Sequence, residues 1–200
     1  MSSPGEAYVA LLKQILDEYG GRISIDGGSK VLVSDANIAQ ALFDTTEHVR
    51  TPYGPILTIA SRGQNTTDAS SLPANTEQVQ ADDLKMDNYT HAVFGVSSED
   101  PKYVLEGLKL MRYAMRPKGY AIVIALRQQT GQSEDGNFVV DLVDKMKYQS
   151  KGKITKFTDV LEFADFERGR IRSFEMSADV NGKKVEAEIV LAMKWDQLSA

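Results

Sequence analysis

Near the N-terminus, apolar residues recur at the spacing of a helix that packs against a core. The residues on this apolar face are Tyr8, Leu12, Ile15 and Tyr19. Charged residues fall off this face, and Gly20-Gly21 follow directly, where two glycines favour the end of a helix. The pattern predicts a helical N-terminal segment over about residues 5–20.

Short apolar runs and helical patterns alternate along the rest of the chain. Runs typical of buried strands cover residues 30–34, 56–60, 90–96 and 120–126, with a brief one at 79–82. Helical spacing covers residues 38–49, 104–115, 139–146 and 158–166. The last two runs, 170–180 and 183–195, are joined by Asn181-Gly182, a strong hairpin signal. This order predicts an α/β fold with a doubly wound, mostly parallel, Rossmann-like sheet and a C-terminal antiparallel β-hairpin.

One segment departs from this alternation. Residues 61–78 are rich in Ser, Thr, Asn and Gln and contain too few apolar residues to pack as a helix, so we expect a polar loop. Loops of this length inside a compact domain are usually functional or disordered.

Length and composition narrow the class of protein. The 200 residues fit a single domain over 1–200, and a net charge of -5 makes nucleic acid and anionic membrane surfaces poor partners. The absence of cysteine excludes disulfides, cysteine zinc sites and cysteine nucleophiles. No signal-peptide pattern or apolar run of roughly 18 residues occurs, so we expect a cytoplasmic protein.

Candidate chemistry is sparse. His48 and His91 have no serine or metal-ligand partner at useful spacing, so we expect structural or surface roles and no metal site. Five lysines between residues 145 and 156 form a basic patch that is typical of a solvated face rather than of a nucleic-acid groove. Ser97 follows a central strand, where open α/β sheets bind ligands, although this polar segment also fits the cap of the next helix.

Residues 87–126 resemble the second half of a class I S-adenosylmethionine-dependent methyltransferase. The matching features are a strand, a helix, the turn Arg116-Pro117-Lys118-Gly119, which is similar to the family's "Arg-Pro-Gly-Gly" turn, and an apolar strand. The C-terminal hairpin is also what that family uses to finish its seven-stranded sheet. In topology the resemblance covers about residues 28–195, and it implies a cofactor site at the carboxyl ends of the strands.

In the cofactor half the chain departs from the family pattern. The resemblance implies a glycine-rich turn after the first strand, where the backbone approaches the cofactor's methionine part, but Ser34-Asp35-Ala36-Asn37 contains no glycine. Aligning residues 56–63 instead supplies one glycine and no helix behind it. Arg62 lies near the position where the family has an acidic residue for the ribose. Asp82 and Asp83 resemble the family's acidic position beside the adenine, and they are equally typical of solvated loop carboxylates.

Two hypotheses follow from this mixture. The first is a methyltransferase-like domain with an eroded S-adenosylmethionine site, which binds no cofactor and acts as a non-catalytic scaffold for a protein partner or neighbouring domain. The alternative is an active S-adenosylmethionine-dependent methyltransferase acting on a small molecule. Its cofactor-binding residues would be Ser34, Asp35, Asp82, Asp83 and Ser97. A different α/β family with another nucleotide pocket also stays open. An open cleft after the first strand favours the enzyme, whereas a side chain filling it favours the scaffold.

Overall fold

A computed structural model describes residues 4–46, 55–63, 67–129, 133 and 135–195. Within these residues one seven-stranded sheet has the order β3-β2-β1-β4-β5-β7-β6. The strands are β1 (Lys30–Val33), β2 (Ile56–Ser61), β3 (Thr76–Gln80), β4 (Tyr89–Val96), β5 (Met115–Leu126), β6 (Ile171–Val180) and β7 (Lys183–Met193). The first five strands in this order, β3, β2, β1, β4 and β5, pair in parallel, and β7 is antiparallel to both of its neighbours, β5 and β6. The predicted doubly wound sheet with a C-terminal hairpin is confirmed.

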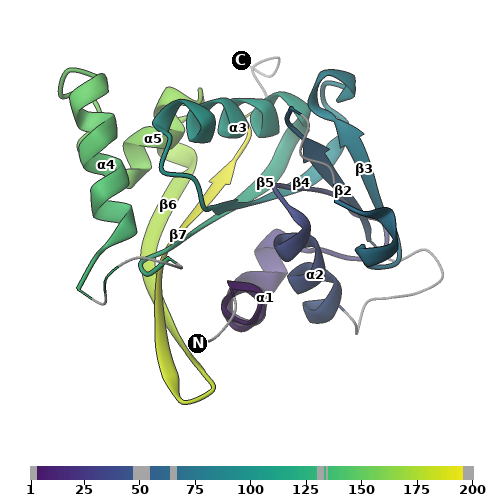
Figure 1. The fold of residues 1–200 in the computed structure, drawn as a ribbon. Coiled ribbons are helices and arrows are strands. Elements are labelled where there is room, and N and C mark those ends of the chain that lie inside the picture. The colour runs from purple at the N-terminus through teal and green to yellow at the C-terminus, as the bar shows by residue number, and fades with distance from the viewer. Residues whose placement is uncertain (1–3, 47–54, 64–66, 130–132, 134, 196–200) are drawn as a thin grey trace.

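Helices cover both faces of the sheet (Figure 1). The α-helices are α1 (Pro4–Ile23), α2 (Ala36–Thr45), α3 (Pro101–Ala114), α4 (Phe138–Gln149) and α5 (Phe157–Phe163). Short 3-10 helices, η2 (Ala69–Ser71), η3 (Ala81–Asp83) and η4 (Arg168–Arg170), lie in the connections. One apolar core joins α1 and α2 to the sheet, and a second joins α3, α4 and α5 to its other face. The central strands are buried on both faces, which explains why they are continuously apolar in the sequence.

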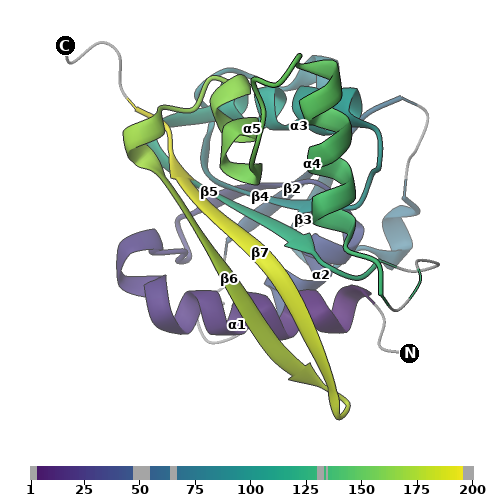
Figure 2. The ribbon, with the colours of Figure 1, turned by 90° about the vertical axis from the view of Figure 1, so that its left-hand side faces the viewer.

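The C-terminal hairpin turns at Asn181-Gly182. Both residues have positive φ angles, 52° and 79°, as a two-residue hairpin turn of this kind requires. Figure 2 shows the hairpin extending past α1, and the Asn181 side-chain amide donates a 3.0 Å hydrogen bond to Glu6 on that helix. The turn of the hairpin is therefore in direct contact with the first helix.

The predicted end of the first helix at Gly20-Gly21 is wrong, because α1 continues to Ile23. Ile23 is buried in the core, and this burial outweighs the poor helix propensity of the two glycines. The helix ends instead at Ser24, which takes a positive φ of 52° and donates its amide hydrogen to the Gly20 carbonyl oxygen.

Two strands begin earlier than predicted, and the first also ends earlier, because Ala81 and Asp82 of the predicted run 79–82 lie in η3. Residues 76–78, which fall inside the predicted polar loop, begin β3, because β2 offers a parallel partner for their backbone groups. Their side chains also hold the segment: the Thr58 hydroxyl donates to Glu77 at 3.1 Å. The predicted turn at residues 116–119 belongs to β5, with Lys118 at a positive φ of 66° and a register irregularity against β4.

Candidate functional site

The crossover connections of the sheet reverse direction between β1 and β4, since strands are added on one side of β1 and then on the other side, beginning with β4. These strands are parallel neighbours, with Val33 opposite Val93, yet β1 leads into α2 on one face and β4 leads towards α3 on the other. In open α/β sheets, ligands bind outside the carboxyl ends of the strands at such a position. We call Ser34, Asp35 and Gly95 at this position the switch point.

At the switch point, the two predicted cofactor-binding residues make contacts within the protein. The Ser34 hydroxyl donates to the Asp35 carboxylate at 3.0 Å and accepts a hydrogen bond from the Gly95 amide at 2.9 Å. The other Asp35 oxygen accepts from the Ile38 amide at 3.0 Å, so Asp35 is the N-cap of α2. The turn after β1 is thereby tied to β4 and to its own helix.

Side chains from α1 and α2 fill the space beside Gly95. A Cβ atom placed on Gly95 would lie 2.9 Å from the Tyr8 hydroxyl oxygen and 3.0 Å from the Ile38 Cδ1 atom. Both side chains are buried, Tyr8 at 2% exposure and Ile38 at 0%. Burial, together with the nearby Asp35 charge, raises the pKa of the Tyr8 hydroxyl far above its ordinary value, so this group stays protonated.

Arg62 extends from the end of β2 towards α3. Its guanidinium lies over the Tyr103 ring, 3.4 Å from the centroid, and donates to the Tyr103 carbonyl oxygen at 2.6 Å. Gly107 permits this approach, because a Cβ atom there would lie 2.8 Å from an Arg62 nitrogen. Burial lowers the pKa of Arg62, and Tyr103 and Glu106 partly oppose that effect. Where the resemblance implies a ribose-binding carboxylate, this chain therefore has the Arg62 cation, which is bound to Tyr103 of α3.

The remaining predicted site residues are exposed at the same edge of the sheet. Ser97 follows β4 directly, and Asp82 and Asp83 lie in η3, directly after β3. The predicted cap of α3 is formed by Asp100, which accepts from the Lys102 amide at 3.1 Å. Because β2 separates β3 from β1, the acidic pair lies two strands from Ser34, and the cofactor role of all five residues stays a prediction.

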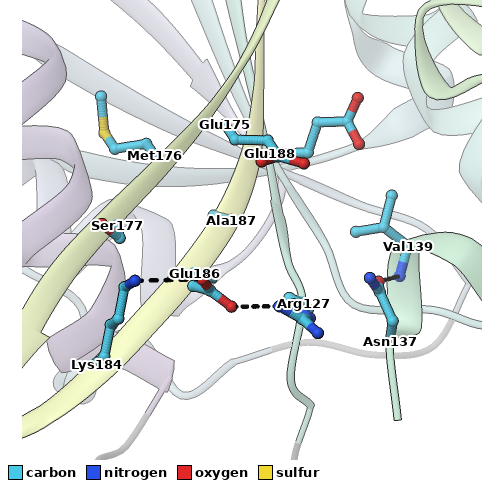
Figure 3. A pocket seen from close by; sticks show the side chains of 10 residues that line it. All are labelled: Arg127, Asn137, Val139, Glu175, Met176, Ser177, Lys184, Glu186, Ala187 and Glu188. Carbon is cyan, nitrogen blue, oxygen red and sulfur yellow. Dashed lines mark hydrogen bonds and ion pairs between the residues drawn. The ribbon is translucent and has the colours of Figure 1, made fainter. Parts of the chain in front are cut away.

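A cavity of about 280 Å³ lies elsewhere, between the hairpin and the start of α4 (Figure 3). Glu186 lies between two cations, Arg127 at 2.5 Å and Lys184 at 3.5 Å. Burial raises the pKa of Glu188; the Ser173 hydroxyl opposes this rise, and the neighbouring Glu175 adds to it. A carboxyl group of this kind can hold a proton or accept a hydrogen bond from a cationic group.

The sequence-based predictions do not include the pair of neighbouring carboxylates that Glu175 and Glu188 form, although the hairpin sequence contains the information. A two-residue turn at Asn181-Gly182 fixes the register, and that register places Glu175 directly opposite Glu188. Like charges at directly facing positions destabilise a sheet, so such a pair in the sequence of a hairpin marks a candidate site.

His91, the histidine that the structure describes, forms no catalytic constellation with the described residues. His48 lies outside the described residues. The His91 ring is buried in β4, where Nε2 donates to the Ile23 carbonyl oxygen at 2.5 Å and Nδ1 lies 2.7 Å from the Thr90 hydroxyl. Burial lowers the pKa of His91. Across the described residues, no cluster of three potential metal ligands occurs. No helix in the same part of the chain is long and apolar enough to cross a membrane.

Comparisons with known proteins identify the fold. No protein-family model matches the sequence, and no curated protein matches it. Among solved structures, the 1,6-didemethyltoxoflavin-N1-methyltransferase of Burkholderia thailandensis, determined with S-adenosylhomocysteine, matches with a TM-score of 0.56 and 14% identity over 96% of this chain and 80% of that one. An S-adenosylmethionine-dependent methyltransferase of Archaeoglobus fulgidus matches with a TM-score of 0.54 and 12% identity over 93% of this chain and 94% of that one. The chain therefore has a class I methyltransferase-like fold.

Proposed function

We propose that this protein is a methyltransferase-like domain that does not bind S-adenosylmethionine and serves as a non-catalytic scaffold for a protein partner or neighbouring domain. One observation carries the proposal: the switch point is occupied by the chain's own groups. Ser34 binds the Gly95 amide, and Tyr8 and Ile38 fill the space beside Gly95. A cofactor that needs close backbone approach there would have to displace buried side chains.

Arg62 supports the same proposal. A ribose needs an acceptor for its hydroxyl hydrogens, whereas a guanidinium supplies donors only. Because Arg62 is already bonded to Tyr103 on α3, rotating it away would also cost that contact.

Exposed apolar side chains support a partner-binding role. In β2, Leu57 and Ile59 are buried and Ile56 is 44% exposed. Elsewhere, Met86 and Tyr113 are 60% and 48% exposed. Their backbone segments lie close together, because the Asp87 amide next to Met86 donates to the Tyr113 carbonyl oxygen at 3.3 Å. Exposed apolar groups that gather in this way commonly mark interaction surfaces.

The deciding experiment is a calorimetric titration with S-adenosylmethionine and S-adenosylhomocysteine, together with melting temperatures at saturating ligand. We expect no heat and no stabilisation at about millimolar ligand, because a ligand that binds the native state must raise its stability. Micromolar binding of either compound would overturn the proposal.

The active methyltransferase is the second candidate. It is supported by the fold and by the exposed Asp82 and Ser97 at the carboxyl ends of β3 and β4. If the titration shows binding, the variants Asp82→Asn and Ser97→Ala test this candidate. Both variants should bind the cofactor more weakly, whereas Asp165→Asn, in the connection after α5, should leave the affinity for the cofactor unchanged.

A further inference from the structure

A second candidate site lies at the opposite edge of the sheet, where the parallel strands begin. An open cavity of about 310 Å³, whose arginines are exposed, is lined by the end of α1, the end of β7 and the segment from η4 into β6. Its floor includes Ile23, Leu191 and Ala192, each at most 7% exposed. This volume is at the lower end of those found for small-molecule sites.

Three arginines from three elements line this cavity. Arg22 comes from the last turn of α1, Arg170 from η4 and Arg172 from β6. We call the space that they surround the arginine cavity. Among the residues that the structure describes, no aspartate or glutamate lines it, although the chain has 28 acidic residues against 23 basic ones. A cavity with three guanidinium groups and no carboxylate strongly favours an anion.

Two of these guanidinium groups have no partner within the described part of the chain. The side chains of Arg22 and Arg172 form no hydrogen bond or ion pair there, whereas Arg168, on the same 3-10 helix as Arg170, pairs with Glu162 at 3.1 Å. Arg170 lies over the Trp195 ring, 4.1 Å from the centroid, which restricts its position and leaves its N–H groups able to donate.

Aromatic side chains complete the walls. Tyr19 and Tyr120 both line the cavity, and the Tyr19 ring is stacked on Phe174 at 5.2 Å. Tyrosine supplies a flat apolar surface for a ring or hydrocarbon group and a hydroxyl that can donate to an anion. The carbonyl end of α1 disfavours an anion nearby, and Arg22 in the last turn offsets that effect.

A neighbouring cavity of about 490 Å³ extends the cationic surface. It shares Ile23 and Tyr120 with the arginine cavity and adds Arg116 and Lys118, against one carboxylate, Asp26. The cationic groups of both cavities therefore lie at the same edge of the sheet, away from the switch point.

We propose that the arginine cavity binds a small organic phosphate. The guanidinium groups of Arg22 and Arg172 hold the phosphate, because a guanidinium can donate two parallel hydrogen bonds to phosphate oxygens. The ring or hydrocarbon part lies on the floor formed by Ile23, Leu191 and Ala192. A small ligand fits better than nucleic acid, because the net charge of -5 opposes an extended polyanion. The site shares no residue with the switch point, so it does not depend on whether S-adenosylmethionine binds.

The test is a titration of isotope-labelled protein followed by nuclear magnetic resonance, with adenosine monophosphate and phenyl phosphate as probes. We expect saturable shifts of the signals of Arg22, Tyr120 and Arg172 with a dissociation constant of about 1 mM or lower. Adenosine and phenol, which lack the phosphate, should cause no such shifts. Inorganic phosphate should bind at least several-fold more weakly, because it has no group for the apolar floor.

Matched variants localise the effect. Arg22→Gln combined with Arg172→Gln should weaken binding of both probes at least tenfold without changing the melting temperature, because neither side chain holds the fold together. Arg168→Gln removes the same charge from a residue outside the cavity and should leave binding unchanged.

Three outcomes would overturn the proposal. The first is the absence of saturable shifts with both phosphates up to about 10 mM. The second is an equal loss of affinity in Arg168→Gln, which would show attraction to net charge alone. The third is tighter binding of a short single-stranded oligonucleotide with a steep salt dependence, which would assign the surface to nucleic acid.

Discussion

The switch point and the arginine cavity lie at opposite edges of one sheet and differ in how their polar groups are satisfied. At the switch point, Ser34 and Asp35 bind backbone amides of the same chain, and Tyr8 lies beside Gly95. In the arginine cavity, Arg22 and Arg172 have no partner among the described residues, and the floor is apolar. The fold directs attention to the first edge, whereas the exposed cations without a protein partner among the described residues lie at the second. Function is therefore better sought in the groups of a site than in the fold that carries it.

The largest effect on stability is expected from adding a side chain at Gly95 in the switch point. Gly95→Val places carbon atoms where the Tyr8 hydroxyl and Ile38 already lie, so we expect a loss of about 2 to 3 kcal/mol in the free energy of unfolding. Urea denaturation measures it. Gly21→Ala is the control, because a Cβ atom there meets nothing within 4 Å and the change should be neutral or stabilising. Equal stability of the two variants would show that the space beside Gly95 is open.

Lys194 lies at the second edge and, unlike Arg22 and Arg172, is bound by other groups of the chain. Its ammonium group lies 2.8 Å from Asp87 and 2.7 Å from the Met115 carbonyl oxygen, and its side chain is 10% exposed. We expect Lys194→Ala to reduce the free energy of unfolding by about 2 kcal/mol. Lys102→Ala, which breaks the exposed 3.9 Å pair with Glu106, should cost less than about 0.5 kcal/mol. A negligible cost for Lys194→Ala would remove the distinction between structural and free cations at this edge.

A smaller effect is expected from removing the hydrogen bond that closes the switch point. Ser34→Ala leaves the Gly95 amide without its acceptor, so the free energy of unfolding should fall by about 1 kcal/mol. Ser97→Ala, at an exposed serine of the same edge, should change it by less than about 0.5 kcal/mol. Thermal and urea unfolding of the two variants give the comparison, and a reversed order would contradict the closed geometry.

His91 gives a prediction about the pH dependence of stability rather than its size at one pH. Because burial lowers its pKa in the folded state, the unfolded chain binds the proton more readily, and stability contributed by neutral His91 is lost as the pH falls through the ordinary histidine pKa. One such proton changes stability by at most about 1.4 kcal/mol per pH unit.

His91→Gln should therefore flatten the dependence of unfolding free energy on pH between about pH 7 and 5.5. Glu188, whose raised pKa acts with the opposite sign, is present in both proteins and cancels in the comparison. An unchanged slope in the variant would show that His91 is not the titrating group.

The sequence predicted the elements whose signals are local. Strands β4 and β5 follow from continuous apolar runs, and the hairpin follows from Asn181-Gly182. Strand β3 was recognised only in part, because Thr76–Gln80 is polar and forms a strand only through its pairing with β2, which comes earlier in the chain.

The candidate sites were harder to predict, because they depend on residues that only the fold brings together. Helical spacing placed Tyr8 in the core but could not indicate that its hydroxyl lies beside Gly95. Nor could spacing show that Arg22, Tyr120 and Arg172 line one cavity, since they come from α1, β5 and β6. The sequence predicts Asp35 as a cofactor ligand, and its position before a helix equally allows the capping role that the structure shows.

The strand order also has a consequence for the way the chain acquires its structure during synthesis. Of the described strands, β7 is synthesised last, and it pairs between β5 and β6, with Tyr120 opposite Met193 and Ile171 opposite Ala192. Until it emerges from the ribosome, β5 has an unpaired edge and β6 has no neighbour in the sheet. The contacts between β5 and β7 are therefore distant in sequence, whereas those between β6 and β7 are local to the hairpin. The distant pairing favours slow folding and leaves nascent chains open to aggregation.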